Sequence, residues 1–350
     1  MQRKAPAVSN DPDGVRQPIA PVGVEVTDAG TRLIALTGAG ATRQRRQERL
    51  SHPLGPDDAQ MVIAEFAIRA LHDTTAADEA AVGQQRLASL AVVIPGLVER
   101  ASGTVLQADG LPEWTHLALG SQLVGQRFAS VTVESAVNAA ALAEASLGAG
   151  TAFESMFYVS LGRRVSGAWV ADGKVIRGAH DRAGQIGHWR ISADGFRCAC
   201  GAAGHLDPVA SAQSIVRNMI GLASGSEESH AAMLAVSQGR AEAMSAAQIF
   251  ELAREGDAAA EAVTTMAIDG LSVAIANVVA VLDPGGIVID APFAGQTERF
   301  LDRLRASVGQ LTASFAPPTS LVASHFGATG ALEGARLIAE QAAWERGHAG

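Results

Sequence analysis

The sequence predicts an α/β fold of two lobes with a cleft between them. Segments that alternate in polarity like strands and segments with helical spacing follow one another in both halves of the chain, which is the pattern of an α/β protein. A length of 350 residues exceeds the usual size of one domain. Because 48% of the residues are hydrophobic and only 18% are charged, each half has enough apolar material for a core.

The first half is predicted to alternate between strands and helices. Residues 22–26 alternate in polarity like a half-buried strand, and a turn that contains glycine leads into a second strand at 31–36. A helix is predicted over 57–72, because apolar residues recur there at helical spacing directly after Pro56. The remaining elements are a short apolar strand at 87–94, a strand at 128–133 and an alanine-rich helix at 135–146.

The second half begins with two paired strands and is otherwise mostly helical. Residues 157–161 and 167–170 have strand character, and the turn Asp172-Gly173 follows them. Residues 212–282 are rich in alanine at helical spacing, with a break at Ser224-Gly225, which favours closely packed helices. The remaining elements are an irregular loop of Gly, Cys and His at 185–211, a buried strand at 287–289 and helices at 297–311 and 330–343.

The charge and the apolar pattern argue against several classes of function. The net charge is −9 and the chain has no basic block, which disfavours a nucleic-acid-binding surface. We find no apolar run of the roughly 18 residues that a membrane span needs, and the first 21 residues lack the apolar centre of a signal peptide. We therefore expect a cytoplasmic protein that binds neither membrane nor nucleic acid directly, with residues 1–20 as a disordered tail.

Two cysteines and two histidines gather in one loop. Cys198 and Cys200 are the only cysteines, and the single residue between them places them badly for a disulfide with each other. Together with His188 and His205 they offer the four ligands of a tetrahedral zinc site. Because four ligands leave no open coordination position, such a site would be structural and would hold an otherwise irregular loop. The alternative is two buried thiols and two unrelated histidines, since C-x-C is not the usual C-x-x-C spacing.

Motifs spread over most of the chain match one known pattern. The run Gly-Gln-Ile-Gly-His at 184–188 is followed by Cys-x-Cys-Gly at 198–201 and by Gly-His-Leu-Asp at 204–207. Further matching segments are Pro95-Gly96, the run from Val133 to Glu144 and the turn Asp283-Pro284. Together they resemble the ROK family (repressors, open reading frames and sugar kinases), with His205 in place of the family's usual last zinc cysteine.

The resemblance implies an actin-like ATPase fold with a sugar site in the cleft between the lobes, often in a homodimer. On this basis we expect an N-terminal α/β lobe over 21–134, completed by a C-terminal helix at 330–345. The C-terminal α/β lobe would cover 135–329 and carry the zinc loop at 185–207.

The implied sugar site departs from the family at its catalytic position. In family kinases an aspartate removes the proton from the sugar hydroxyl; Ala136 stands there in this chain, and a methyl group accepts no proton. Loss of a general base typically costs about 10²–10⁴ in rate. The positions that the resemblance implies for sugar binding are Ser135, Gln185, His188 and Asp207, of which only His188 is identical to the family's residue.

The implied nucleotide site is altered as well. The resemblance implies nucleotide contacts at Thr31, Gly162 and Gly167. The family's first phosphate turn corresponds to residues 27–31, which are one residue short. The second phosphate loop contains Arg163 and Arg164, which either block a phosphate or rebuild an anion site by charge. Asp290-Ala291 replaces a pair of glycines near the nucleoside, where a carboxylate would repel phosphate.

These departures favour a ROK-type protein that binds a sugar or has a regulatory role without catalysing phosphoryl transfer. The altered phosphate turn and residues 106–114 resemble the effector domain of family regulators, although the residues before it are too few for a helix-turn-helix domain. The first alternative is a divergent, glucokinase-like sugar kinase that uses Mg-ATP and takes Asp207 or Glu134 as its base. The second alternative is a dimeric scaffold with a vestigial cleft.

Overall fold

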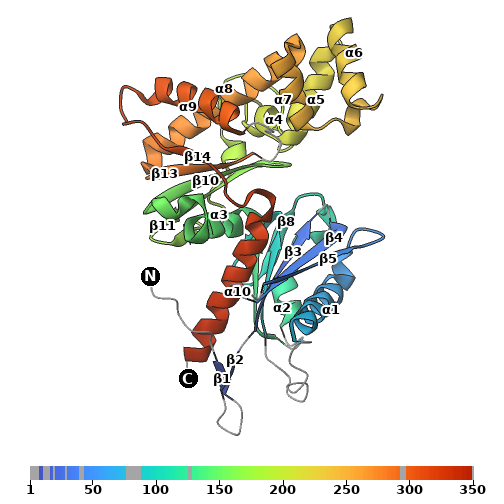
Figure 1. The fold of residues 1–350 in the computed structure, drawn as a ribbon, viewed down its shortest axis with the longest axis vertical. Coiled ribbons are helices and arrows are strands. Elements are labelled where there is room, and N and C mark those ends of the chain that lie inside the picture. The colour runs from blue at the N-terminus through green and yellow to red at the C-terminus, as the bar shows by residue number, and fades with distance from the viewer. Residues whose placement is uncertain are drawn as a thin grey trace. The chain divides into compact units, whose positions relative to one another are not determined.

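The computed structural model of the chain describes residues 8–10, 16–18, 20–27, 30–38, 43–75, 88–124, 128–291 and 297–348. The chain divides into two compact units (Figure 1). Unit 1 comprises Met1–Ala143, Gly178–Arg182 and Thr329–Gly350, and unit 2 comprises Glu144–Arg177 and Ala183–Ala328. The last helix of the chain therefore belongs to the same unit as its first strands.

Unit 1 is built on a mixed sheet. Its elements are β1 (Val8–Asn10), β2 (Arg16–Pro18), β3 (Ala20–Thr27), β4 (Arg32–Thr37), β5 (Gln44–Arg49), α1 (Pro56–Thr75), β6 (Ala88–Ile94), β7 (Gly96–Glu99), β8 (Thr104–Ala108), α2 (Leu119–Leu123), β9 (Phe128–Ser135), the greater part of α3 (Ala136–Leu147), and α10 (Gly330–His348). The main sheet has five strands in the order β5-β4-β3-β6-β9. The β5-β4-β3 pairs are antiparallel, and the β3-β6-β9 pairs are parallel.

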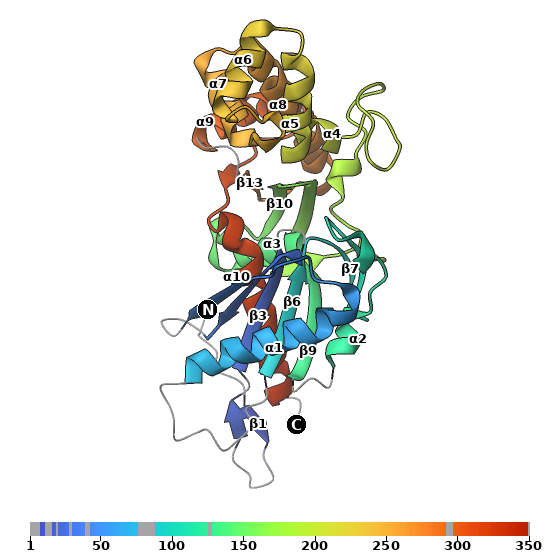
Figure 2. The ribbon, with the colours of Figure 1, turned by 90° about the vertical axis from the view of Figure 1, so that its right-hand side faces the viewer.

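The central strand β6 shows why both faces of this sheet are covered. All its residues are buried. Leu90 and Val92 belong to the apolar cluster that α1 and α2 complete, whereas Ala91 and Val93 face α3 and α10, because alternate side chains of a strand point to opposite faces. Figure 2 shows α1 lying across one face of the strands. Gly334 lets α10 approach α3, since a Cβ atom there would lie 1.9 Å from the Ala139 carbonyl oxygen.

The strand β5 forms one edge of the unit 1 sheet. It reads Gln-Arg-Arg-Gln-Glu-Arg, and its side chains are exposed or half-buried. This strand could not be predicted from the sequence, since it has no apolar face. Neither could β1 and β2, which pair with each other inside the segment expected to be a disordered tail. Strands of three residues are too short to show a periodic pattern.

Unit 2 repeats the strand pattern of unit 1. Its elements are the end of α3, β10 (Ser155–Leu161), β11 (Val165–Ala171), β12 (Lys174–Ile176), α4 (Asp207–Ala210), α5 (Ala212–Ala223), α6 (Glu227–Val236), α7 (Ala246–Glu255), α8 (Ala258–Leu282), β13 (Gly286–Asp290), α9 (Thr297–Thr312) and β14 (Leu321–Ala323). The strand order is β12-β11-β10-β13-β14. Again the first two pairs are antiparallel and the last two are parallel.

The long helix α8 forms the centre of the unit 2 core. It is capped by Asp257, whose side chain accepts a hydrogen bond from the Ala260 backbone N–H (2.8 Å). In the described part of the chain it is the one helix long and apolar enough to cross a membrane. Because Glu261 and Asp269 interrupt its sequence, it is not visible as one continuous apolar run, and the expectation that no segment is long and apolar enough does not hold for it. Half of its most apolar stretch is buried, and it packs in one cluster with β10 and β13, so we interpret it as a core helix.

Candidate functional site

The zinc loop, residues 185–207, is held by backbone hydrogen bonds around sharp turns. The Cys198 N–H donates to the Ala202 carbonyl oxygen (2.8 Å), which closes the turn that carries both cysteines. At Gly204 the backbone has φ +75°, and a Cβ atom would lie 2.1 Å from the Ser192 carbonyl oxygen. Only glycine fits this position without a clash, and it directs the next residue, His205, back toward the cysteines.

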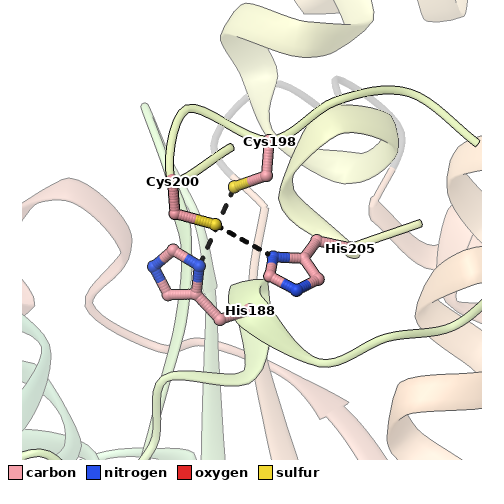
Figure 3. A group of neighbouring side chains, drawn as sticks. All are labelled: His188, Cys198, Cys200 and His205. Carbon is pink, nitrogen blue, oxygen red and sulfur yellow. Dashed lines mark hydrogen bonds between the residues drawn. The ribbon is translucent and has the colours of Figure 1, made fainter. Parts of the chain in front are cut away.

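The four predicted metal ligands lie together in this loop (Figure 3). One ligand atom from each of His188, Cys198, Cys200 and His205 lies within 4.8 Å of the others. The distance is 3.8 Å from Cys198 Sγ to His188 Nδ1 and 3.4 Å from Cys200 Sγ to His205 Nδ1. Zinc bonds of about 2.3 Å to sulfur and 2.0 Å to nitrogen place tetrahedral ligands roughly 3.3–3.8 Å apart, so the donor set and its spacing fit zinc.

The two cysteines differ in their exposure to solvent. Cys198 is buried and Cys200 is exposed. Burial raises the pKa of the Cys198 thiol above its ordinary value; a hydrogen bond with the Cys200 backbone opposes this shift, and the Cys200 thiol and the Asp207 carboxylate add to it. A bound zinc ion supplies the positive charge that stabilises the thiolate at such a position. Metal binding and deprotonation of Cys198 are therefore coupled.

The histidine ligands meet the sulfur atoms through Nδ1. His188 Nδ1 faces Cys198, and His205 Nδ1 faces Cys200. An imidazole that binds metal through Nδ1 keeps its proton on Nε2. Because the His188 side chain is exposed, its Nε2–H remains available as a hydrogen-bond donor.

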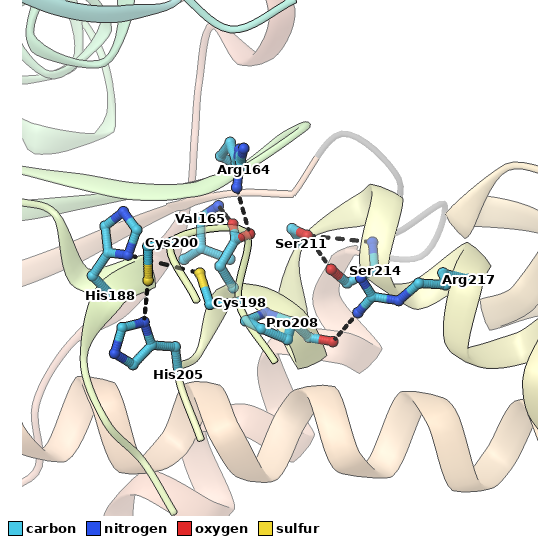
Figure 4. A network of polar contacts seen from close by, with 11 residues as sticks. Arg164, Val165, His188, Cys198, Cys200, His205, Pro208, Ser211, Ser214 and Arg217 are labelled. Atoms are coloured by element: carbon cyan, nitrogen blue, oxygen red, sulfur yellow. Dashed lines mark hydrogen bonds and ion pairs between the residues drawn. The ribbon is translucent and has the colours of Figure 1, made fainter. Parts of the chain in front are cut away.

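The buried carboxylate of Asp207 holds the turn between β10 and β11. Figure 4 shows its partners in this turn, Arg164 and Val165, near the four zinc ligands. Its Oδ1 accepts a hydrogen bond from the Val165 backbone N–H (2.9 Å), and its Oδ2 forms an ion pair with Arg164 Nη1 (3.2 Å). A Cβ atom on Gly187 would lie 2.3 Å from the Val165 carbonyl oxygen and 3.4 Å from the Asp207 Cβ. The turn at 185–188, Asp207 and Arg164 are thus neighbours in unit 2.

In unit 1, the junction between β9 and α3 carries the other predicted sugar residue and the altered catalytic position. Ser135 ends β9, and its hydroxyl donates to the Gly96 carbonyl oxygen (2.8 Å). Ala136 is the first residue of α3. The structure therefore places Ser135 in unit 1, whereas Gln185, His188 and Asp207 lie in unit 2.

The carboxylate of Glu134 is engaged in hydrogen bonds and an ion pair within unit 1. Glu134 is 1% exposed. Its Oε1 accepts hydrogen bonds from the Ser135 backbone N–H (2.9 Å) and from Asn138 Nδ2 (3.0 Å), and its Oε2 pairs with Arg100 Nε (3.2 Å). This network holds the start of α3 against the end of β9.

Comparison with known proteins identifies the family. Residues 23–342 match the model of the ROK family. The chain belongs to the ROK family. It is similar to a glucokinase of Thermotoga maritima, at 27% identity over 71% of this chain and 77% of the relative. It is also similar to a putative xylose repressor of Caldicellulosiruptor sp., at 30% identity over 72% of this chain and 59% of the repressor.

A solved ROK structure has the same fold. A glucokinase from Streptomyces griseus, in complex with glucose and AMPPNP, superposes with a TM-score of 0.72 at 24% identity, over 92% of this chain and 99% of the glucokinase. The predicted fold class is therefore confirmed: the two mixed five-stranded sheets are those of the actin-like ATPase fold. The predicted zinc cofactor is confirmed too, since the cluster of His188, Cys198, Cys200 and His205 is typical of the ROK zinc-binding motif, with His205 at the place of the usual last cysteine.

The ROK nucleotide positions are only partly described. Asp28 and Ala29 of the first phosphate turn lie outside the described residues. The Thr31 carbonyl oxygen accepts a hydrogen bond from Leu50 N–H (2.8 Å). On the second loop, Gly167 N–H donates to the Gly184 carbonyl oxygen (2.7 Å), and Gly162 accepts from the Ala212 N–H (3.0 Å). These bonds connect the hairpin to the residue before the zinc loop and to the start of α5, and the role of both glycines in nucleotide binding stays a prediction.

A pocket of about 600 Å³ opens beside this hairpin within unit 2. The hairpin lines it with Gly162 and the exposed Arg163, and the first turn of α5 lines it with Ala212 and Gln213. The segment at 242–247, up to the start of α7, completes it. Arg163 is therefore the arginine of the hairpin that lines this pocket, whereas Arg164 forms an ion pair with Asp207.

The carboxylate of Asp290 points to a tyrosine. Asp290 ends β13, and its Oδ2 accepts a hydrogen bond from the Tyr158 hydroxyl (2.9 Å). Burial raises the pKa of Tyr158 well above its ordinary value, so the hydroxyl keeps its proton and donates. Burial also raises the pKa of Asp290, the nearby Glu144 carboxylate adds to this shift, and the hydrogen bond from Tyr158 opposes it.

We expect Asp290→Asn to stabilise the protein at neutral pH. Because the pKa of Asp290 is higher in the folded state than in the unfolded state, ionisation of this carboxyl costs stability as the pH rises through the folded pKa. The amide keeps an oxygen for the Tyr158 hydroxyl and carries no charge. The melting temperature of Asp290→Asn should therefore exceed that of wild type by more at about pH 8 than at about pH 4. The exposed control Asp269→Asn should show no such difference, and an equal effect at both pH values would contradict the argument.

Several residues that shape the site were not found from the sequence. Arg100 and Asn138 hold Glu134, and Tyr158 holds Asp290. Asn138 lies four residues after Glu134, a helical spacing that could have been noticed. Arg100 and Tyr158 come from strands or turns far from their partners in sequence, and nothing local marks them.

Proposed function

We propose that this ROK protein binds a sugar without phosphorylating it. The proposal depends on one observation: the residue at the start of α3, where ROK kinases carry their base, is Ala136, and the neighbouring carboxylate is already engaged. Glu134 accepts two hydrogen bonds and pairs with Arg100. A base must reach the substrate hydroxyl, and the Glu134 carboxylate is almost completely buried, with both of its oxygens held by groups of unit 1.

The unit 2 part of the proposed sugar site offers both donors and acceptors. The exposed His188 donates through Nε2, and the half-buried Gln185 offers an amide that donates and accepts. Each oxygen of Asp207 has a second lone pair. The carboxylate can therefore accept hydrogen bonds from sugar hydroxyls while it keeps its bonds with the Val165 N–H and with Arg164. A few fixed polar groups of this kind are what recognition of a small polar ligand needs. Ser135 stays a prediction from the sequence.

The test combines sugar binding with a phosphorylation assay. We expect calorimetry to detect binding of at least one neutral monosaccharide and no sugar phosphate to form with Mg-ATP. Asp207→Asn should weaken sugar binding by about tenfold or more, because it removes a charged acceptor. Asp194→Asn, an exposed change in the same loop, is the matched control and should bind like wild type. Zinc content and melting temperature of each variant report that the loop is intact.

Two outcomes would contradict the proposal. Formation of a sugar phosphate by wild type, abolished in Asp207→Asn, would make the protein a kinase with a different base. Absence of any stabilisation by a wide panel of monosaccharides would favour a scaffold with a vestigial site, because a ligand of the native state raises its stability.

The pocket beside Gly162 and Arg163 favours a second candidate, a divergent ATP-dependent sugar kinase. Its volume of about 600 Å³ can hold a nucleotide, and Arg163 can pair with a phosphate. The base in this case would be Asp207, which is also paired but is more exposed than Glu134, at 8% against 1%. Calorimetry with Mg-ATP at millimolar concentration tests it: absence of nucleotide binding rules this candidate out, and binding that Arg163→Gln weakens supports it.

A further inference from the structure

A second pocket of unit 2 is formed by α7, α8 and α9, three helices that pack together (Figure 2). Its volume is about 360 Å³, within the usual range for small-molecule sites. None of its lining residues belongs to the zinc loop, to the predicted sugar positions or to the hairpin of β10 and β11. Nothing in the proposed sugar site therefore accounts for it.

The rim of this pocket carries two arginines without an acidic partner. Arg299 and Arg303 both line it from α9, four residues apart and hence on one face of the helix. Arg303 Nη2 donates to the neutral Thr265 hydroxyl (3.0 Å). Among the described residues, Arg299 has no hydrogen-bond or ion-pair partner.

Three carboxylates near this pocket are each paired with an arginine other than Arg299 and Arg303. On α9, Glu298 and Asp302 both pair with Arg305, at 3.2 Å and 2.8 Å. On α7, Glu251 pairs with Arg254 (2.7 Å). Arg299 and Arg303 carry like charges four residues apart on α9 and repel each other. An anion bound between them would therefore be stabilising.

The other walls of the pocket suit an apolar group. Phe250 of α7 and Phe300 of α9 meet edge to face, with ring centroids 5.6 Å apart. The buried Ile268 of α8 lines the same pocket. Glu261, in the first turn of α8, also lines the pocket. Its carboxylate can accept a hydrogen bond from a hydroxyl group of a ligand. The lining thus combines the arginines Arg299 and Arg303, the ion pair of Glu251 with Arg254, an aromatic wall and the acceptor Glu261.

We propose that this pocket binds a small organic phosphate. The phosphate group would lie between Arg299 and Arg303, since guanidinium groups match phosphate oxygens in geometry and charge. The apolar part of the ligand would lie against Phe250 and Phe300. This site is separate from the proposed sugar site and gives the protein a second ligand, so each can fail its test without the other.

The test uses phenyl phosphate as the probe on the full chain, with inorganic phosphate and phenol for comparison. We expect calorimetry or ligand-observed NMR to show phenyl phosphate binding about tenfold more tightly than inorganic phosphate, because the ring leaves water. Phenol alone should bind more weakly than either. The double variant Arg299→Gln and Arg303→Gln should weaken phenyl phosphate by about tenfold or more.

Two further variants make the test specific. Lys174→Gln with Arg240→Gln removes two exposed charges of unit 2 outside the pocket and should leave the affinity unchanged. Phe250→Leu should weaken phenyl phosphate and leave inorganic phosphate unaffected. The proposal is overturned if phenyl phosphate does not bind at about 10 mM, or if the double arginine variant binds it as wild type does. It is equally overturned if inorganic phosphate binds as tightly as phenyl phosphate, since the aromatic wall would then recognise nothing.

Discussion

Replacement of Cys198 by serine should release the zinc ion and unfold the zinc loop. Apparent binding energies of roughly 10–16 kcal/mol in zinc-finger peptides show how much a four-ligand site can contribute to a fold. The loop from 185 to 207 contains two short helical turns at its ends and is otherwise held by turns and isolated bridges. Without metal, only these short elements and the backbone hydrogen bonds of the turns would order it. We expect zinc to fall from about one ion per chain to almost none.

The same change should lower the melting temperature of unit 2. Loss of even 5 kcal/mol corresponds to a decrease of roughly 10–20 °C for a unit of this size. Elemental analysis gives the zinc content, and limited proteolysis should show new cleavage between Trp189 and Leu206. His205→Asn should behave like Cys198→Ser, whereas His180→Asn, an exposed histidine outside the cluster, should keep its metal. Full zinc retention in Cys198→Ser would show that this thiolate is not a ligand.

Removal of the Glu134 carboxylate should strongly destabilise unit 1. In Glu134→Ala the buried Ser135 N–H and the Asn138 amide lose their acceptor, and Arg100 loses its ion pair. Breaking a buried pair costs about 3–5 kcal/mol, and we expect the lower end because the Arg100 side chain is 37% exposed. Urea unfolding measures the loss.

Two variants separate a positioning role from a catalytic role for Glu134. Glu134→Gln keeps an oxygen for Ser135 and Asn138 and loses only the charge, so it should cost clearly less than Glu134→Ala. Glu113→Ala, an exposed glutamate of the same unit, should have almost no effect. A group that served only as a proton acceptor would leave stability unchanged in both Glu134 variants, and that result would contradict the structural role.

The long elements and the metal ligands could be predicted because their signals are local. The helix at 57–72 and the strand at 87–94 appear as α1 and β6, with small shifts at their ends. The zinc ligands share one loop of the chain, so spacing alone brings them close. The short strands β1, β2, β12 and β14 have three residues each and show no period that could reveal them.

The partners of the site's charged groups could not be predicted, because they are set by tertiary packing. Arg164 was expected either to block a phosphate or to bind one, and the structure pairs it with Asp207, 43 residues away. Asp290 was expected to repel phosphate, and its carboxylate faces Tyr158, 132 residues away. In both cases the residue type was noted from the sequence, but the direction of the side chain was not.

The polar edge strand β5 has a consequence for the behaviour of the protein at high concentration. An open strand edge is a template on which another chain can add, which is how many sheets begin to aggregate. Arg45, Arg46, Glu48 and Arg49 place charge along this edge, to which no further strand pairs in the described part of the chain. A strand of another molecule that paired with β5 would have to remove water from these side chains. If that strand were the β5 of a second copy, its charges would also repel those of the first. The charged edge at β5 thus disfavours the addition of further strands to the unit 1 sheet, and with it aggregation.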